Sequence, residues 1–146
     1  MAAWGSEENG QNGYLKSVEL KDKDGYYEES LAYSEMRSLL SKGIDIPDAM
    51  FCANDEMAWG VIQAFQDIGV RVPEDVSVIG YDDSTLSAYY GVPLTTVHSP
   101  IVEMGSASAN ELFRLLNSEG DKSGTVTKLS PTMVYRSSCG KHKERK

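Results

Sequence analysis

Two short stretches of sequence decide the fold, AMFCAND at residues 49–55 and VSVIGYDD at residues 76–83. Each is an apolar run that ends abruptly in an amide or in carboxylates, which is typical of a strand buried on both faces. Between them, residues 56–69 carry apolar side chains at helical spacing. A strand, a helix and a strand within about thirty residues form the βαβ unit of a parallel sheet. The sequence therefore predicts an α/β fold with a mostly parallel sheet and helices on both faces.

Polar residues follow both of these predicted strands directly. Asn54 and Asp55 follow the first strand, and Asp82 and Asp83 follow the second. In open α/β sheets, ligands bind just beyond the carboxyl ends of the strands, so we expect any small-molecule site around these four residues and the adjacent Tyr81. Asp55 is also well placed to cap the helix that begins beside it, because its oxygen can accept hydrogen bonds from the first helical amides.

The rest of the chain contains weaker strand and helix signals. Residues 14–20 alternate and predict a strand, whereas residues 28–42 place their apolar side chains on one helical face. Residues 93–97 predict a short strand, and Pro100 stands at the favoured first position of a second amphipathic helix. Residues 126–136 predict a final extended segment.

Length and charge limit the classes of protein to which the chain can belong. It has 146 residues, enough for one domain, and a net charge of −8 at pH 7. Proteins that bind phosphate backbones usually carry the opposite sign, so we do not expect this chain to contact DNA directly. No apolar run reaches the length of a membrane span. Residues 1–13 have the composition of a disordered leader and residues 141–146 form a basic tail.

The two cysteines form no CxxC pair, which fits a reduced, cytoplasmic protein. The two histidines have no partners at the spacing of metal ligands, so no metal site is expected. The sequence contains no GxSxG, P-loop or GxGxxG motif, and we therefore expect neither an enzyme nor a bound cofactor.

Three longer segments carry a resemblance to a known family. They are DAMFCANDEMAWGVIQAFQDIGVRVPEDVSVIGYDD at 48–83, PLTTVHSPIVEMG at 93–105 and SPTMVYRSSCG at 130–140. In this order and spacing they closely resemble the carboxyl-terminal half of the lactose/galactose-repressor (LacI/GalR) family of bacterial transcription regulators. The resemblance implies a two-lobed effector domain of the periplasmic-binding-protein fold, which holds a small ligand between its lobes.

The resemblance also implies how the chain is organised. Residues 14–140 would be a partial effector domain, in which residues 94–120 pack with a first lobe that has no counterpart here. The family's helix-turn-helix head has no counterpart either, so DNA would be contacted only through a head domain outside this chain. The implied partners are a small effector, such as a sugar or nucleoside, and further copies of the chain in a homodimer or higher oligomer.

Four residues match ligand-contacting positions of the family, and each has an ordinary structural alternative. Asp82 matches a ligand carboxylate, although it could bond local turn amides instead. Asn54 matches a ligand amide or is a left-handed turn residue. Tyr27 matches an aromatic residue that stacks on the ligand, or is a surface tyrosine. Ser99 matches a polar contact, but we favour a helix cap because it precedes Pro100.

Three aromatic residues are candidates for a subunit interface. Trp59 lies off the apolar face of its predicted helix, and a large apolar side chain on an outer face suggests an interface. Tyr89 and Tyr90 lie in the loop that follows the second strand, which forms dimer contacts in the family. Burial of Trp59 in the core is the alternative.

Two other functions share the predicted fold. One is a solute-binding protein of a sugar transporter, or the sensor lobe of a signalling protein. The other is a magnesium-dependent receiver or phosphatase, which also places carboxylates at strand ends. That second alternative needs a positioned lysine, and the sequence places no lysine at the end of a predicted strand.

Overall fold

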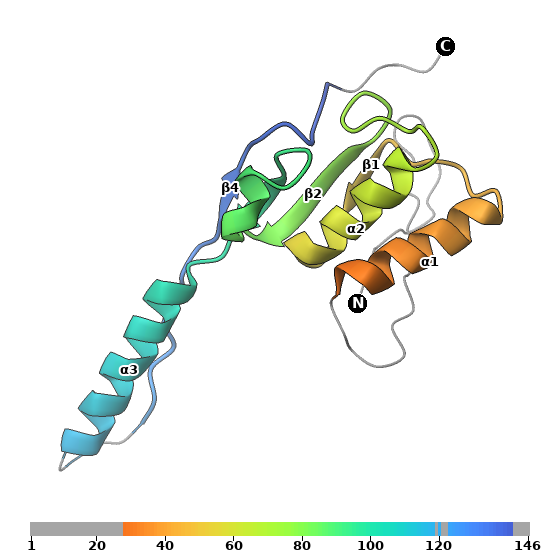
Figure 1. Cartoon of the computed structure of the whole chain (residues 1–146). Helices are drawn as coiled ribbons and strands as arrows, with labels where there is room; N and C mark the ends of the chain where they lie inside the picture. Colours follow the sequence, from red (N-terminus) through yellow and green to blue (C-terminus); the bar gives the residue numbers. More distant parts are fainter. Residues whose placement is uncertain (1–27, 119, 121–122, 142–146) are drawn as a thin grey trace, which may run out of the picture.

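A computed structural model describes residues 28–118, 120 and 123–141 of the chain (Figure 1). In chain order its elements are α1 (Glu29–Ser41), β1 (Ala49–Phe51), α2 (Asp55–Gln66), β2 (Ser77–Asp82), the 3-10 helix η1 (Thr85–Ala88), β3 (Thr95–His98), α3 (Ile101–Asn117) and β4 (Thr132–Val134). The leader, the strand expected at residues 14–20, and Tyr27 lie outside the described residues.

The four strands form one open sheet in the order β1-β2-β3-β4. The first three strands are parallel, and β4 runs antiparallel to β3. The predicted α/β fold with a mostly parallel sheet is therefore confirmed, and β1, α2 and β2 are its βαβ unit. Phe51 pairs with Ile79, and Asp82 pairs with His98. This register brings the carboxyl ends of three strands to one edge of the sheet.

The core lies between the sheet and the helices α1 and α2. Phe65 of α2, Met36 of α1 and Val78 of β2 are almost completely buried there. A Cβ atom added at Gly60 of α2 would lie 2.2 Å from the backbone oxygen of Glu29, so only glycine lets α1 approach α2 this closely. The two helices therefore pack directly on each other, and α2 packs on the sheet (Figure 1).

The strands are not buried on both faces, and in this respect the sequence prediction is wrong for the described chain. Val78 and Gly80 of β2 are buried, whereas Ile79 between them is only partly buried. Phe51 of β1 is 53% exposed. Successive side chains of a strand point to opposite faces, and α1 and α2 cover the face that carries Val78.

Helix α3 extends away from the body of the molecule (Figure 1). None of its residues is buried. The chain then returns along the helix, where Arg114 donates to the backbone oxygen of Ser123 and Glu111 accepts from the amide of Thr125. It re-enters the sheet as β4. Neither α3 nor any other described helix is long and apolar enough to cross a lipid bilayer.

Candidate functional site

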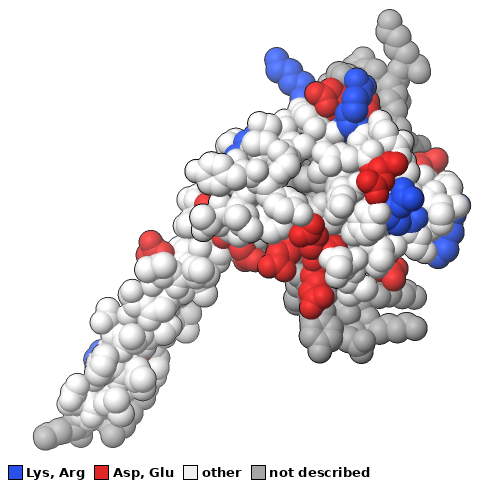
Figure 2. Space-filling model, in the orientation of Figure 1, with Lys and Arg blue, Asp and Glu red and all other residues white. Residues whose placement is uncertain are grey.

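Three of the four predicted ligand residues lie at the carboxyl ends of neighbouring strands. Phe51 of β1 pairs with Ile79 of β2, and Asn54 and Asp82 follow this pair at the same interval. Ser99 directly follows β3, whose last residue pairs with Asp82. We call these three residues the strand-end rim. Figure 2 shows acidic side chains gathered on this side of the molecule, where α1 and α2 begin and β2 ends.

Asn54 caps helix α2. Its φ of −150° is extended, and its Oδ1 atom accepts a hydrogen bond of 2.8 Å from the amide of Met57. The alternative of a left-handed turn residue is therefore wrong.

Asp55 does not cap the helix, contrary to the prediction, but turns into the protein. Its side chain is 1% exposed and accepts three hydrogen bonds from residues far away in the sequence. They come from the amide of Ser84 at 2.7 Å, and from the hydroxyls of Ser87 and Thr96 at 2.5 Å each. A Cβ atom added at Gly80 would lie 2.2 Å from Oδ1 of Asp55, so glycine makes room for this carboxylate. Asp55 thus joins the start of α2, the η1 segment and β3.

The turn after β2 contains two consecutive aspartates in the left-handed region, with φ of 106° for Asp82 and 55° for Asp83. Such φ values are uncommon for residues other than glycine and are best tolerated by asparagine and aspartate. The Asp82 side chain is exposed, and within the described chain its carboxylate has no hydrogen-bond partner. Partial burial of this carboxyl, followed by the charge of Asp55, raises the pKa of Asp82.

Asp83 is the partner of two basic side chains that sequence reasoning did not assign to the site. Its Oδ1 atom accepts from Nη2 of Arg136 at 2.6 Å, and its Oδ2 atom lies 3.1 Å from Nδ1 of His98. Partial burial alone would raise the pKa of Asp83, but the hydrogen bonds and charges of Arg136 and His98 together lower it. The two adjacent carboxyls therefore differ in protonation behaviour.

Ser99 contributes no helix cap. Pro100 occupies the cap position of α3, where no side-chain hydrogen bond is formed, and the carbonyl of Ser99 accepts from the amide of Ile101. The predicted capping role is therefore wrong.

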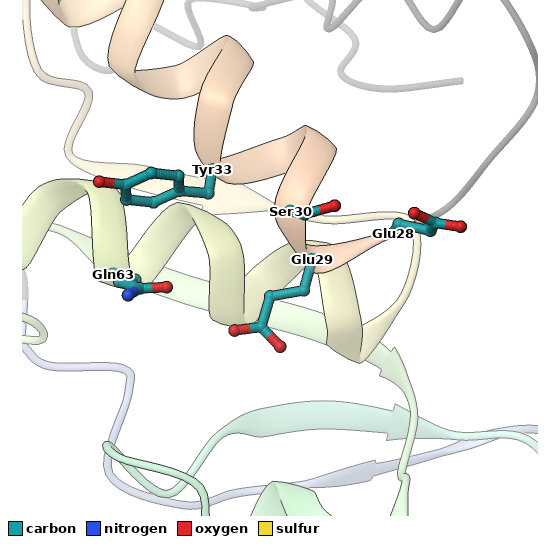
Figure 3. Close-up of a pocket in the computed structure, with 5 residues that line it drawn as sticks. All are labelled: Glu28, Glu29, Ser30, Tyr33 and Gln63. Carbon is teal, nitrogen blue, oxygen red and sulfur yellow. The ribbon is translucent and has the colours of Figure 1, made fainter.

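A shallow hollow lies at the start of α1, next in sequence to Tyr27. Figure 3 shows its lining on the first turns of α1 and on α2, formed by Glu28, Glu29, Ser30, Tyr33 and Gln63. None of the rim residues lines this hollow. Its tyrosine is partly buried against the core and donates its hydroxyl to Asp67, and we do not place the ligand site there.

Trp59 does not lie on an outer surface, and the alternative of core burial is correct for the described chain. Its side chain is 5% exposed. The ring of Tyr90 covers it, with 4.8 Å between ring centroids, and the Tyr90 hydroxyl donates to Glu29 at 2.6 Å. Tyr90 is partly exposed, whereas Tyr89 is 82% exposed. Of the three candidate interface residues, Tyr89 is therefore the one most available to a partner.

The described residues offer little for metal or nucleophilic chemistry. No group of three or more His, Cys, Asp or Glu side chains within them could hold a metal ion. Cys52 follows β1 and is buried, and this burial, with the charge of Asp55, raises the pKa of its thiol to about 12. A thiol with this pKa stays protonated near neutral pH and is a poor nucleophile.

Comparison with known proteins gives one consistent result. A family model described as a periplasmic binding protein-like domain matches residues 5–139. The HTH-type transcriptional repressor PurR of Pasteurella multocida is 36% identical over 115 residues, which cover 79% of this chain and 34% of that protein.

Two solved structures have the same fold at similar identity. One is the lac repressor dimer bound to operator and the anti-inducer ONPF, with a TM-score of 0.68 and 33% identity over 77% of this chain and 38% of that chain. The other is a complex of the transcriptional regulator CelR with cellobiose, with a TM-score of 0.69 and 33% identity over 78% of this chain and 34% of that chain.

The chain therefore belongs to the periplasmic binding protein-like domain family. The predicted resemblance to LacI/GalR-type regulators is confirmed, because the matching proteins are transcriptional repressors and regulators rather than enzymes. The chain spans little more than a third of the length of these relatives.

Proposed function

We propose that this chain is part of the effector-sensing domain of a LacI/GalR-type transcriptional regulator and contacts a small polar effector from one side. The geometry of the strand-end rim carries the proposal. Asp82 presents an exposed carboxylate at the end of β2, and Asn54 and Ser99 follow the ends of the neighbouring strands β1 and β3. An ionised carboxylate makes strong hydrogen bonds to hydroxyl donors, and an amide can both donate and accept.

These groups suit a ligand with several hydroxyls, so we propose a sugar or a nucleoside as the effector. The CelR relative, whose structure contains cellobiose, supports a sugar. The repressor relatives favour a regulator over a transport protein or a magnesium-dependent phosphotransfer protein. They also support a cytoplasmic protein that contacts DNA through a head domain and has no catalytic activity.

A titration followed by NMR tests the ligand site. We would add cellobiose, lactose or adenosine to the isotopically labelled chain and follow every backbone amide signal. Saturable shifts are expected at Asn54, Asp82 and Ser99. The Asp82→Asn variant should bind at least about tenfold more weakly, or about 1.4 kcal/mol. The matched control is Glu103→Gln, since Glu103 is an exposed carboxylate on the first turn of α3.

Two outcomes would contradict the site. Equal affinity of Asp82→Asn and the unchanged chain would remove Asp82 from it. Saturable shifts elsewhere, with no shift at the rim for any of the three compounds, would refute the proposed location and effector class together.

We further propose that the apolar surface of α3 packs on the part of the regulator that corresponds to the first lobe. The exposed side chains of this helix include Ile101, Val102, Leu112, Phe113 and Leu116. The helix carries few charged residues, and most of its surface in Figure 2 is uncharged. A helix that shows this much apolar surface normally has a partner. Helix α3 would therefore cross to the first lobe, whereas β3 of the same segment belongs to the chain's own sheet.

We also propose that the loop around Tyr89 contacts a second copy of the chain. Tyr89 and its neighbour Leu86 are both exposed, and aromatic residues are enriched at interface centres. In sedimentation experiments, Tyr89→Glu should weaken the dimer. Tyr135→Glu is the matched control, because Tyr135 is 80% exposed and follows β4. A dimer that Tyr89→Glu leaves intact would exclude this surface.

A further inference from the structure

The turn that carries Asp82 has a backbone that needs support from its surroundings. Both Asp82 and Asp83 have positive φ, at 106° and 55°. Residues other than glycine keep such a conformation only where neighbouring groups determine it, and such positions cluster at functional sites. The amide of Asp83 makes only a long contact of 3.4 Å, to the hydroxyl of Thr96. The amide of Ser84, the next residue, donates to Asp55 at 2.7 Å, and the side chain of Asp83 provides the other strong contacts of the turn.

Arg136 supplies this support from the opposite end of the described chain. One end of its guanidinium donates to Asp83 at 2.6 Å, and the other donates to the backbone oxygen of Leu94 at 2.8 Å. Its own amide donates to the hydroxyl of Thr95 at 2.9 Å. The Arg136 and Asp83 side chains are only 18% and 19% exposed. A planar guanidinium held at two points, on a backbone held at a third, fixes the position of the carboxylate that it binds.

The contacts give the two aspartates different roles. Both oxygens of Asp83 are occupied, one by Arg136 and the other by the partly exposed His98. Asp83 is therefore committed to the protein, and Asp82 alone faces outward with its oxygens available in the described chain. Loss of the contact to Arg136 would leave Asp83 with His98 as its side-chain partner and weaken the support of the backbone at Asp82.

We propose that Arg136 is a positioning residue for the effector site, which acts through Asp83 to hold the left-handed turn that presents the Asp82 carboxylate at the strand-end rim. This role rests on the proposed function of the rim, but the contacts of Arg136 with Asp83 and Leu94 are present without any effector. Arg136 does not touch the effector. A substitution of Arg136 therefore changes the site through the geometry of Asp82.

The test uses NMR on the complete 146-residue chain without an effector. The coupling between the amide and Hα protons, with the matching NOE, reports φ at Asp82. The pH dependence of the side-chain carboxyl signals reports the pKa of Asp82 and Asp83. In Arg136→Met we expect Asp82 to lose its positive φ or to average over several conformations, and the pKa of Asp83 to rise. Arg136→Lys should restore Asp82 in part, because a lysine keeps the charge but not the planar fork.

Two further variants separate positioning from a general effect on folding. Arg71→Met removes an arginine that likewise pairs with an aspartate, Asp75, but at an exposed site, and it should leave Asp82 unchanged. Asp83→Asn breaks the same ion pair from the other side and keeps a residue that tolerates positive φ. Asp83→Asn should reproduce the change in φ at Asp82. The double variant with Arg136→Met should show little further change in φ, because both substitutions break the same contact. If Arg136→Met does not fold, Arg136→Lys and Asp83→Asn give the same test.

A positive φ at Asp82 that survives both Arg136→Met and Asp83→Asn would overturn the proposal. Titration of the same variants with cellobiose then tests the consequence for binding, where Arg136→Met should weaken affinity about tenfold and Arg71→Met should not. The backbone readout needs no ligand. A failure of cellobiose to bind the unchanged chain would therefore count against the proposed effector class, whereas an unchanged turn would count against the role of Arg136.

Discussion

Removal of the buried carboxylate of Asp55 should lower the unfolding free energy more than removal of any other single side-chain group in the described chain. It accepts three hydrogen bonds, and two of the donors, Ser87 and Thr96, are completely buried. In Asp55→Ala all three donors lose their acceptor. A buried donor without an acceptor costs about 1–3 kcal/mol, and hydroxyls can partly recover by rotation, so we expect a loss of roughly 3–5 kcal/mol of unfolding free energy. A domain of this size has about 5–15 kcal/mol in total.

Urea unfolding followed by circular dichroism measures this loss. Asp55→Asn keeps one side-chain oxygen as an acceptor and should lose about half as much, roughly 2 kcal/mol. Asp75→Asn is the control, because Asp75 is an exposed carboxylate that binds Arg71, and it should leave the midpoint nearly unchanged. A loss below about 1 kcal/mol in Asp55→Ala would refute the argument, since it would mean that the three donors find other partners at no cost.

Three further changes probe the same region and α3. Gly80→Ala should destabilise the fold by about 1–3 kcal/mol in urea unfolding, because its Cβ would meet Asp55 and Leu94 at 2.2 and 2.8 Å. The pKa of Asp83 is lowered from its ordinary 3.8, so the stability that this residue contributes should be present above that pH and be lost as the pH falls through the lowered pKa; Asp83→Asn should remove this dependence. The apolar surface of α3, which we propose packs on the first lobe, should make the isolated chain self-associate. Phe113→Glu, on this exposed surface, should reduce that association in sedimentation without changing the unfolding free energy. A strictly monomeric unchanged chain at high concentration would count against this.

The arrangement of the rim could be predicted because it depends on local signals. An apolar run that stops at an amide, a helical repeat, and a second run that stops at carboxylates define β1, α2 and β2 with their direction. Once the strands are parallel, Asn54 and Asp82 must meet at the same edge, and the observed pairing of Phe51 with Ile79 places them there.

The role of Asp55 could not be predicted, because it depends on contacts between distant residues. Asparagine and aspartate cap helices about equally well, so the sequence does not distinguish adjacent Asn54 and Asp55, and the prediction assigned the cap to Asp55. Asp55 rather than Asn54 is buried because the hydroxyls of Ser87 and Thr96, 32 and 41 residues away, donate to it and because Gly80 has no side chain to occupy its place. A buried carboxylate forms only where such donors converge.

The burial of Trp59 and the role of Arg136 also depend on contacts between distant residues, and neither could be predicted. Helical spacing places Trp59 off the apolar face, but Tyr90 from the following loop covers it. Arg136 reaches Asp83 across 53 residues, and only the antiparallel return of β4 beside β3 brings the two together. In a one-dimensional pattern, a single arginine near the end of an extended segment does not differ from a solvated surface residue.

The two adjacent aspartates show how position decides function where residue type does not. Burial and the charge of Asp55 raise the pKa of Asp82, while Arg136 and His98 lower that of Asp83. Asp82→Asn should therefore weaken effector binding and leave the turn in place, because the carboxylate has no partner in the described chain. Asp83→Asn should disturb the turn first and binding only as a result. Equal effects of the two substitutions on the backbone of Asp82 would mean that the carboxylates share one role and that the separation into a ligand group and a structural group does not hold.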